Sequence, residues 1–149
     1  MLISELAIEI NNLLVNGILF TDDKIKEIIN SYDGDWKIYS IKNETQYNKI
    51  KVYENDIFDI YIIIWNINQA SKIHNHSSNG CWLKILDGKV EERIYNQKLE
   101  LTKYSVQNKG EISFIKDDIG YHSVKNINNN ITVSLHVYNP PNFKITNFL

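Results

Sequence analysis

Apolar residues at the start of the chain recur with the period of an α-helix. The residues that follow this spacing within 1–16 are Leu2, Leu6, Ile10, Leu13 and Leu14. Gly17 ends the pattern, and the cap candidates at 21–23 then begin a second helical pattern. That pattern contains Ile25, Ile28 and Ile29 and stops near 33–34. The first 34 residues therefore predict two helices.

After position 34 the pattern changes to short segments rich in Ile, Val, Tyr and Trp. Clusters of Asn, Asp and Gly separate these segments, which are 47–53, 57–66, 80–86, 89–95, 98–105, 111–116, 121–127 and 131–138. Asp87-Gly88 between two of them is typical of a tight hairpin turn. Many short strands at regular spacing are typical of a sandwich or barrel. We therefore expect one domain over 1–149, in which a helical segment, 1–34, packs on a small double-sheet β-barrel, 35–149.

The last of these segments has two faces of different character. One face is apolar and carries Val133, Leu135 and Val137. The other face is polar and carries Thr132, Ser134, His136 and Tyr138. A polar strand face usually contacts water, but a barrel that encloses a ligand is lined with placed polar groups. The histidine and tyrosine on this face favour the second interpretation.

Composition and charge restrict the classes of function. A net charge of −2 gives no electrostatic basis for binding nucleic acid or an anionic membrane. No apolar run approaches the ~20 residues that span a bilayer, and the first five residues lack the basic start of a secretory signal. The single cysteine, Cys81, excludes an internal disulfide and fits a reducing compartment. We expect a cytoplasmic monomer.

The histidines indicate a metal site. His74 and His76 flank Asn75, and on a strand the residues i and i+2 point to the same face. Imidazole is the commonest protein ligand of transition metals, although a single histidine is more often an ordinary core or surface residue. No carboxylate occurs at 77–84 to complete the usual two-histidine, one-carboxylate iron site. A third histidine, His122, is the expected replacement, which leaves the site more positive and suited to an anionic thiolate.

Three segments of the chain resemble a known family. They are SKIHNH with GCWLKILDG at 71–88, DDIGYHSVKN at 117–126 and VSLHVYNPP at 133–141. Their order and spacing resemble the thiol dioxygenases of the cupin superfamily, and most closely the cysteine dioxygenases. The N-terminal part, with its YDGDW and YNK runs at 32–36 and 47–49, is compatible with the same family.

The resemblance implies a fold, a cofactor and a reaction. The fold would be mainly β, a cupin (double-stranded β-helix, jelly-roll) barrel with two N-terminal helices. One Fe(II) per chain would be held by His74, His76 and His122. The partners would be a small thiol and O2, and the reaction would convert L-cysteine to cysteine sulfinic acid.

The resemblance also implies roles for residues near the iron. Cys81 and Tyr138 match a pair that a thioether can join, and the Tyr138 hydroxyl would hydrogen-bond the bound oxygen or the substrate carboxylate. His136 and Ser134 match residues that orient this tyrosine. The family tends to have a cis peptide bond at the position of Asn139-Pro140.

The sequence departs from the family in ways that affect the substrate. The resemblance implies that Tyr47, Lys49 and Tyr138 bind the substrate. Cysteine-specific members have an arginine that binds the substrate carboxylate two residues after the position of Tyr47, whereas this chain has Lys49. Lysine supplies a point charge rather than a planar pair of donors, and it also fits a solvated strand residue. Relatives that oxidise 3-mercaptopropionate lack the arginine too. A 3-mercaptopropionate dioxygenase and a non-catalytic metal- or ligand-binding cupin therefore remain alternatives.

Two further departures concern Asn75 and the end of the sequence. Asn75 stands where the family usually has aspartate, and its side chain is expected to point away from the metal. Familiar members continue for tens of residues beyond the position of Leu149, and in them this tail helps to cover the pocket. We therefore expect a more open pocket, or closure by a partner chain.

Overall fold

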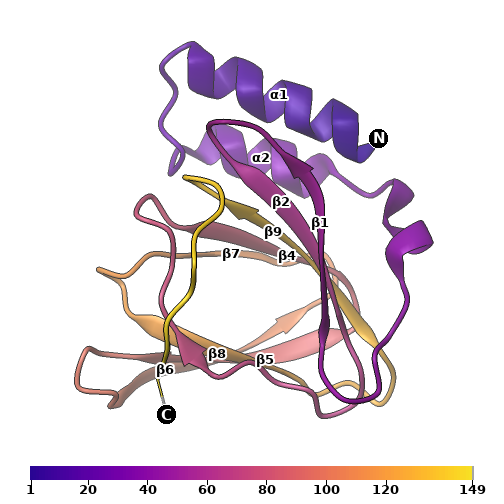
Figure 1. Cartoon of the computed structure of the whole chain (residues 1–149), viewed down its shortest axis with the longest axis vertical. Coiled ribbons are helices and arrows are strands. Elements are labelled where there is room, and N and C mark those ends of the chain that lie inside the picture. Colours follow the sequence, from indigo (N-terminus) through magenta and orange to yellow (C-terminus); the bar gives the residue numbers. More distant parts are fainter. Residues whose placement is uncertain (149) are drawn as a thin grey trace.

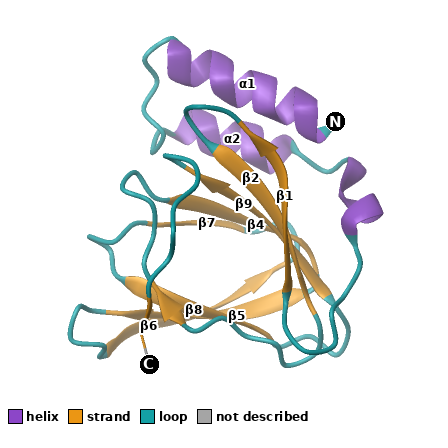
Figure 2. Cartoon of the chain, in the orientation of Figure 1, coloured by secondary structure: helices purple, strands orange, loops and turns teal. Residues whose placement is uncertain are grey.

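The computed structural model describes residues 1–148, and it contains two helices and two antiparallel β-sheets. Figure 1 shows both helices on the outer side of one sheet, with the second sheet on the other side of the molecule. The mainly β fold with two N-terminal helices is therefore confirmed. Figure 2 also shows the long loops between the two sheets, near the C-terminus. Within residues 1–148, no helix has the length and apolar character needed to cross a membrane.

The helices have the bounds that the sequence predicts, to within a few residues. α1 spans Ile3–Val15 and α2 spans Asp23–Ser31. The Asp22 side chain caps α2 by accepting a hydrogen bond from the backbone N–H of Lys24 at 2.8 Å. The buried residues of α1 are Ile3, Leu6, Ala7 and Ile10. Leu2 precedes the helix and is half-exposed, so the buried stripe is shifted from the predicted one.

The first sheet lies against the helices. Its strands, in spatial order, are β1 (Asn48–Glu54), β2 (Asp59–Trp65), β9 (Thr132–Tyr138), β4 (Cys81–Asp87) and β7 (Ile112–Ile115). Two polar groups of β4 tie the sheet to the helical segment. Trp82 donates its indole N–H to the carbonyl of Phe20 at 2.8 Å, and Lys84 donates to the carbonyls of Asn30 and Tyr32 at 2.6 and 2.7 Å. The lysine thereby satisfies carbonyl groups at the end of α2.

The second sheet faces the first across the interior. Its strands, in spatial order, are β10 (Asn147–Phe148), β3 (Ile73–His74), β8 (Tyr121–Asn126), β5 (Lys89–Tyr95) and β6 (Leu101–Asn108). No ladder of backbone hydrogen bonds joins the edges of the two sheets within the described chain. The expected barrel is therefore an open two-sheet sandwich.

The two faces of strand β9 lie in different environments. Val133, Leu135 and Val137 pack in the large apolar cluster between the helices and the first sheet. Ser134 and His136 point into the space between the sheets, and both are buried. All seven residues of β9 are buried, which confirms that the polar face of this strand does not face bulk water. The main core is therefore under the helices, and a second, mixed interior lies between the sheets.

Short elements differ most from the sequence-based expectation. The expected strand over His74 and His76 ends at His74, because β3 has only two residues and His76 follows in a loop. β10 and a 3-10 helix at Asp35–Tyr39 are absent from the predicted elements. The peptide bond between Asn139 and Pro140 is cis, as predicted.

Candidate metal centre and pocket

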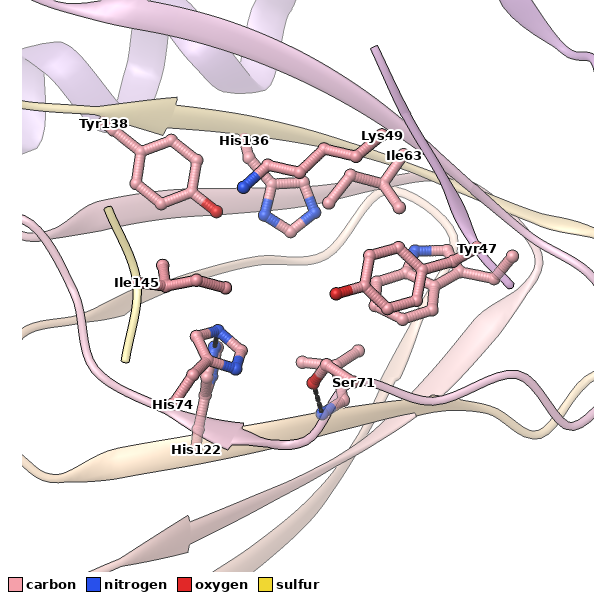
Figure 3. Close-up of a pocket in the computed structure, with 11 residues that line it drawn as sticks. Tyr47, Lys49, Ile63, Ser71, His74, His122, His136, Tyr138 and Ile145 are labelled. Atoms are coloured by element: carbon pink, nitrogen blue, oxygen red, sulfur yellow. Dashed lines mark hydrogen bonds between the residues drawn. The ribbon is translucent and has the colours of Figure 1, made fainter. Parts of the chain in front are cut away.

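The polar residues of the interior surround one narrow pocket between the two sheets. Figure 3 shows His136 and Tyr138 of β9 on one side of this pocket and His74 and His122 of the second sheet on the other. The apolar part of the wall comes from Ile63, Trp65, Val124 and Ile145. The cavity between these side chains is small, about 20 Å³, and it opens toward solvent.

Three of the four histidines form a cluster at one wall of the pocket, which His74 and His122 line. His74, His76 and His122 are all buried, and they offer ligand atoms that lie within 4.8 Å of one another. Backbone pairing explains part of this placement, since His74 on β3 lies directly opposite His122 on β8. The chain then turns after β3 and brings the ring of His76 to 4.4 Å from that of His122, between ring centroids.

Oxygen atoms behind the three rings determine which nitrogen atoms face the centre of the cluster. The Nδ1 atom of His74 lies 2.8 Å from the carbonyl oxygen of Lys72, and Nδ1 of His122 lies 2.7 Å from the Glu92 carboxylate. Nδ1 of His76 is 3.3 Å from Asp117. These oxygen atoms accept hydrogen bonds, so each Nδ1 carries the proton and each Nε2 presents a lone pair.

With each Nδ1 protonated, no donor among residues 1–148 satisfies the three Nε2 atoms. Within the same residues Nε2 of His76 is buried without a hydrogen-bond partner, and the Nε2 atoms of His74 and His122 face each other at 3.2 Å. Two lone pairs at this distance repel unless a cation lies between them. Two nitrogens at right angles around one ion, each ~2.1 Å from it, are about 3 Å apart. The cluster therefore fits a single transition-metal ion held by three neutral imidazoles.

The protonation states of the histidines agree with this interpretation. Burial, with a smaller contribution from the nearby His122 ring, lowers the pKa of His74 to about 3. Burial also lowers the pKa values of His76 and His136 well below their ordinary range. These rings are therefore neutral at pH 7, which is the state that binds metal ions.

Cys81 and Tyr138 lie side by side on adjacent strands. They are directly opposed in the register of β4 and β9, and both are buried. Burial raises the pKa of the Cys81 thiol and that of the Tyr138 hydroxyl, so both are protonated at neutral pH. Directly opposed residues have Cβ atoms about 5 Å apart, which brings a thiol within reach of an aromatic ring.

A hydrogen-bonded chain lies behind Tyr138 on the same strand. The Ser134 hydroxyl accepts the indole N–H of Trp65 at 2.9 Å and lies 2.8 Å from Nε2 of His136. Because an indole N–H can only donate, the hydroxyl is free to donate its own proton to this nitrogen. The His136 ring is nearly parallel to that of Tyr138, with centroids 6.2 Å apart. Trp65 thus has a part in this arrangement that the sequence analysis missed.

Lys49 brings a positive charge to the same pocket. Lys49 is an exposed residue, but its ammonium group lies 4.6 Å from the ring centroid of Tyr61 and 5.2 Å from that of Tyr138. Burial of the ammonium group lowers the pKa of Lys49. No carboxylate of the described residues lies within 4 Å of it. Tyr47 packs its ring on Trp65 at 4.6 Å and completes this side of the pocket. The three predicted substrate-binding residues, Tyr47, Lys49 and Tyr138, therefore all line it.

Asn75 points its side chain away from the cluster, as predicted. Its Oδ1 accepts the backbone N–H of Thr146 at 2.7 Å, and the backbone N–H of Asn75 donates to the carbonyl of Thr146 at 3.3 Å. Together with the pairing of β10 with β3, these bonds fix the last described segment beside the pocket. Ile145 of this segment lines the pocket, which the sequence analysis did not anticipate.

The two carboxylates behind the histidines, Glu92 and Asp117, were not among the predicted site residues. Glu92 is buried on β5 between Val90 and Ile94, which are two residues away on either side and face the same interior. A charged residue at an apolar position of an alternating strand is the signal that could have identified it. Asp117, which contacts His76, is in a loop after β7 and has no comparable signal.

Two facing antiparallel sheets with a buried histidine cluster between them are the arrangement of a cupin fold. Solved structures support this class at the level of the fold. A Klebsiella pneumoniae protein with a double-stranded β-helix domain superposes with a TM-score of 0.66 at 16% identity, over 80% of this chain and 98% of that one. A cupin superfamily protein of Desulfitobacterium hafniense gives a TM-score of 0.54 at 9% identity, over 66% and 82% of the two chains.

Sequence comparison identifies the family. The family model "Cysteine dioxygenase type I" matches residues 3–149, so the chain belongs to this family. Human cysteine dioxygenase type 1 is 31% identical over 130 residues, an alignment that covers 80% of this chain. The matched region spans 65% of the length of that relative.

Proposed function

We propose that this chain is a non-haem Fe(II) thiol dioxygenase that oxidises L-cysteine with O2 to cysteine sulfinic acid. The observation that carries the proposal is the convergence of three Nε2 lone pairs in one buried cluster, two of whose histidines line the pocket. The ammonium group of Lys49 in the same pocket supports an anionic substrate. Membership of the cysteine dioxygenase family supports the reaction.

His74, His76 and His122 would hold the ion, one ion per chain. Imidazole ligands suit iron, and three of them leave coordination positions open for substrate. When bound, Fe(II) would supply the redox chemistry that transfers both atoms of dioxygen to the thiol sulfur.

The other pocket residues bind and orient the substrate. Lys49 would pair with the substrate carboxylate, because its ammonium group has aromatic faces beside it and no competing carboxylate within 4 Å among the described residues. The Tyr138 hydroxyl, protonated at neutral pH, would donate a hydrogen bond to the substrate or to oxygen beside it. Ser134 and His136 would hold this tyrosine in place, and Ile145 helps to exclude water.

Lysine at the carboxylate-binding position supports 3-mercaptopropionate as a second candidate substrate. Lysine offers a charge without the paired donors of arginine, so it selects the position of the substrate carboxylate less strictly. A thiol substrate without an amino group would still pair its carboxylate with the Lys49 ammonium group. The two thiols are therefore compared in the same experiment.

Oxygen consumption tests the proposed function. Purified protein is loaded with Fe(II) under nitrogen and mixed aerobically with L-cysteine or 3-mercaptopropionate, and chelator-treated protein serves as the control. We expect iron-dependent oxygen uptake, and with 18O2 a sulfinate that contains both labelled atoms. Uptake with 3-mercaptopropionate alone would favour the second substrate. Absence of uptake with both thiols would contradict the dioxygenase and favour a non-catalytic metal- or ligand-binding cupin.

Changes at Lys49 should alter the binding of carboxylate-bearing thiols. Lys49→Met removes a charge-assisted hydrogen bond, so KM for L-cysteine should rise about 10- to 100-fold. The rate with cysteamine, a thiol without a carboxylate, serves as the control and should change little. Lys49→Arg should increase the preference for cysteine over cysteamine, because arginine adds paired donors. An unchanged cysteine-to-cysteamine ratio in both variants would place Lys49 outside substrate recognition.

We further propose a thioether between Cys81 and Tyr138. Forming the bond removes the hydrogen of the thiol and one hydrogen of the ring, with O2 as the oxidant. The directly opposed positions of the two residues support it. A crosslinked chain is more compact when denatured, so protein that has turned over should migrate faster on denaturing electrophoresis than Cys81→Ser. Intact mass should fall by two hydrogens. Identical migration and an unreduced mass after prolonged turnover would contradict the crosslink.

A further inference from the structure

Behind His122, on the side away from the pocket, lies a buried carboxylate. Glu92 is only 5% exposed, and its Oε2 accepts the Nδ1–H of His122 at 2.7 Å. The contact follows from strand pairing, because Ile94 lies opposite His122 on the neighbouring strand and Glu92 is two residues away on the same face. Burying a carboxylate is unfavourable unless hydrogen bonds and a positive charge compensate for it.

The second oxygen of Glu92 is also occupied. Its Oε1 accepts the side-chain N–H of Gln107 at 2.8 Å, and the Gln107 carbonyl oxygen accepts the hydroxyl of Ser113 at 3.1 Å. Glu92 and Gln107 are both in the second sheet, whereas Ser113 is on β7 of the first. This series of hydrogen bonds from His122 to Ser113 therefore links the two sheets, and it holds the Glu92 carboxylate in one orientation.

The other carboxylate near the cluster has a different setting. Asp117 accepts the backbone N–H of His76 at 2.8 Å, but its contact with the ring nitrogen is longer, at 3.3 Å. Its side chain is 42% exposed, so water screens its charge. Of the two carboxylates, only Glu92 makes a short, buried hydrogen bond to a histidine ring.

We propose that Glu92 is a positioning residue for the metal centre, which fixes His122 as a ligand and supplies the negative charge that the three imidazoles lack. This inference rests on the metal site of the proposed function. Three neutral imidazoles leave the full charge of a divalent ion uncompensated, whereas a two-histidine, one-carboxylate site carries one negative charge in its ligands. Glu92 places that charge one hydrogen bond behind the ligand, where it also raises the basicity of His122.

Metal affinity tests this assignment without measuring activity. Co(II) is titrated into metal-free protein and followed by its visible absorption. Glu92→Gln should weaken binding about 10- to 100-fold. Asp117→Asn makes the same carboxylate-to-amide change behind His76. It should lower the Co(II) affinity by less than about threefold, because water screens the charge of Asp117. The proposal would be overturned if the Co(II) affinity of Glu92→Gln lay within twofold of that of the unaltered protein, or if both variants lost affinity equally.

A charge exchange separates charge from hydrogen bonding. The double variant Glu92→Gln, Gln107→Glu keeps a hydrogen bond at every step from His122 to Ser113, but moves the negative charge one residue further from His122. Its Co(II) affinity should remain several-fold below that of the unaltered protein. Full recovery would show that only ring orientation matters and would overturn the charge assignment.

Nitrogen NMR provides an independent readout in metal-free protein. The His122 ring should be protonated at Nδ1 in the unaltered chain, the tautomer that Glu92 selects. Glu92→Leu should shift it toward the Nε2-protonated form, and thermal melting shows whether this variant is folded. An unchanged tautomer in folded Glu92→Leu would overturn the positioning role. If unaltered protein binds no Co(II), the proposed metal site fails, whereas unaltered affinity in Glu92→Gln contradicts only the role of Glu92.

Discussion

Replacing His122 with alanine should remove iron from the protein. The unaltered chain should retain about one Fe(II) after desalting, and His122→Ala should retain less than about a tenth of that. Loss of a direct ligand is expected to cost more than the 10- to 100-fold that a hydrogen-bond partner behind a ligand costs. The two remaining Nε2 atoms, on His74 and His76, cannot enclose an ion in a three-coordinate face. Metal analysis of the desalted protein measures the effect.

The fourth histidine provides a matched control. His136 is buried in the same pocket, but its Nε2 is engaged by the Ser134 hydroxyl at 2.8 Å, and it is not part of the cluster. His136→Gln preserves a hydrogen-bonding group and should retain iron at the level of the unaltered chain. Undiminished iron in His122→Ala, or equal loss in both variants, would show that the three-histidine assignment is wrong.

The sequence was most informative where a residue's surroundings follow from its own strand. The alternation in β9 separated an apolar face from a polar face, and the structure has the first under the helices and the second in the interior. The motifs around His74, His122 and Tyr138 likewise identified the polar residues that the structure brings together in one pocket. Each of these assignments needed only local periodicity or a recognisable run of residues.

The residues behind the histidines depend on contacts that local patterns do not encode. Glu92 and His122 are 30 positions apart, and Asp117 and His76 are 41 apart. The contact of Glu92 follows from the pairing of β5 with β8, and that of Asp117 follows from the path of a loop. Both are tertiary features. The two-residue strands β3 and β10 also depend on tertiary contacts, because β3 pairs with both β8 and β10 and neither strand is long enough to be predicted from strand propensity.

The alternation in β9 also predicts that stability and metal binding can be changed separately. Leu135 is fully buried in the cluster between helices and sheet, between Ser134 and His136 in sequence but on the opposite face. Leu135→Ala removes buried methyl groups and leaves a cavity, so the free energy of unfolding should fall by about 2–5 kcal/mol. Urea unfolding of metal-free protein measures this as a lower midpoint with an unchanged slope.

An exposed leucine on another strand is the matched control for this change. Leu101 begins β6 and is 54% exposed, so Leu101→Ala should alter the free energy of unfolding by less than about 0.5 kcal/mol. Under conditions where Leu135→Ala is fully folded, its Co(II) affinity should equal that of the unaltered chain, because no side chain facing the pocket has changed. A weaker affinity in folded Leu135→Ala would mean that packing under the helices sets the positions of the histidines across the sandwich. The two faces of β9 would then act as one unit, and the separation of core from site would be wrong.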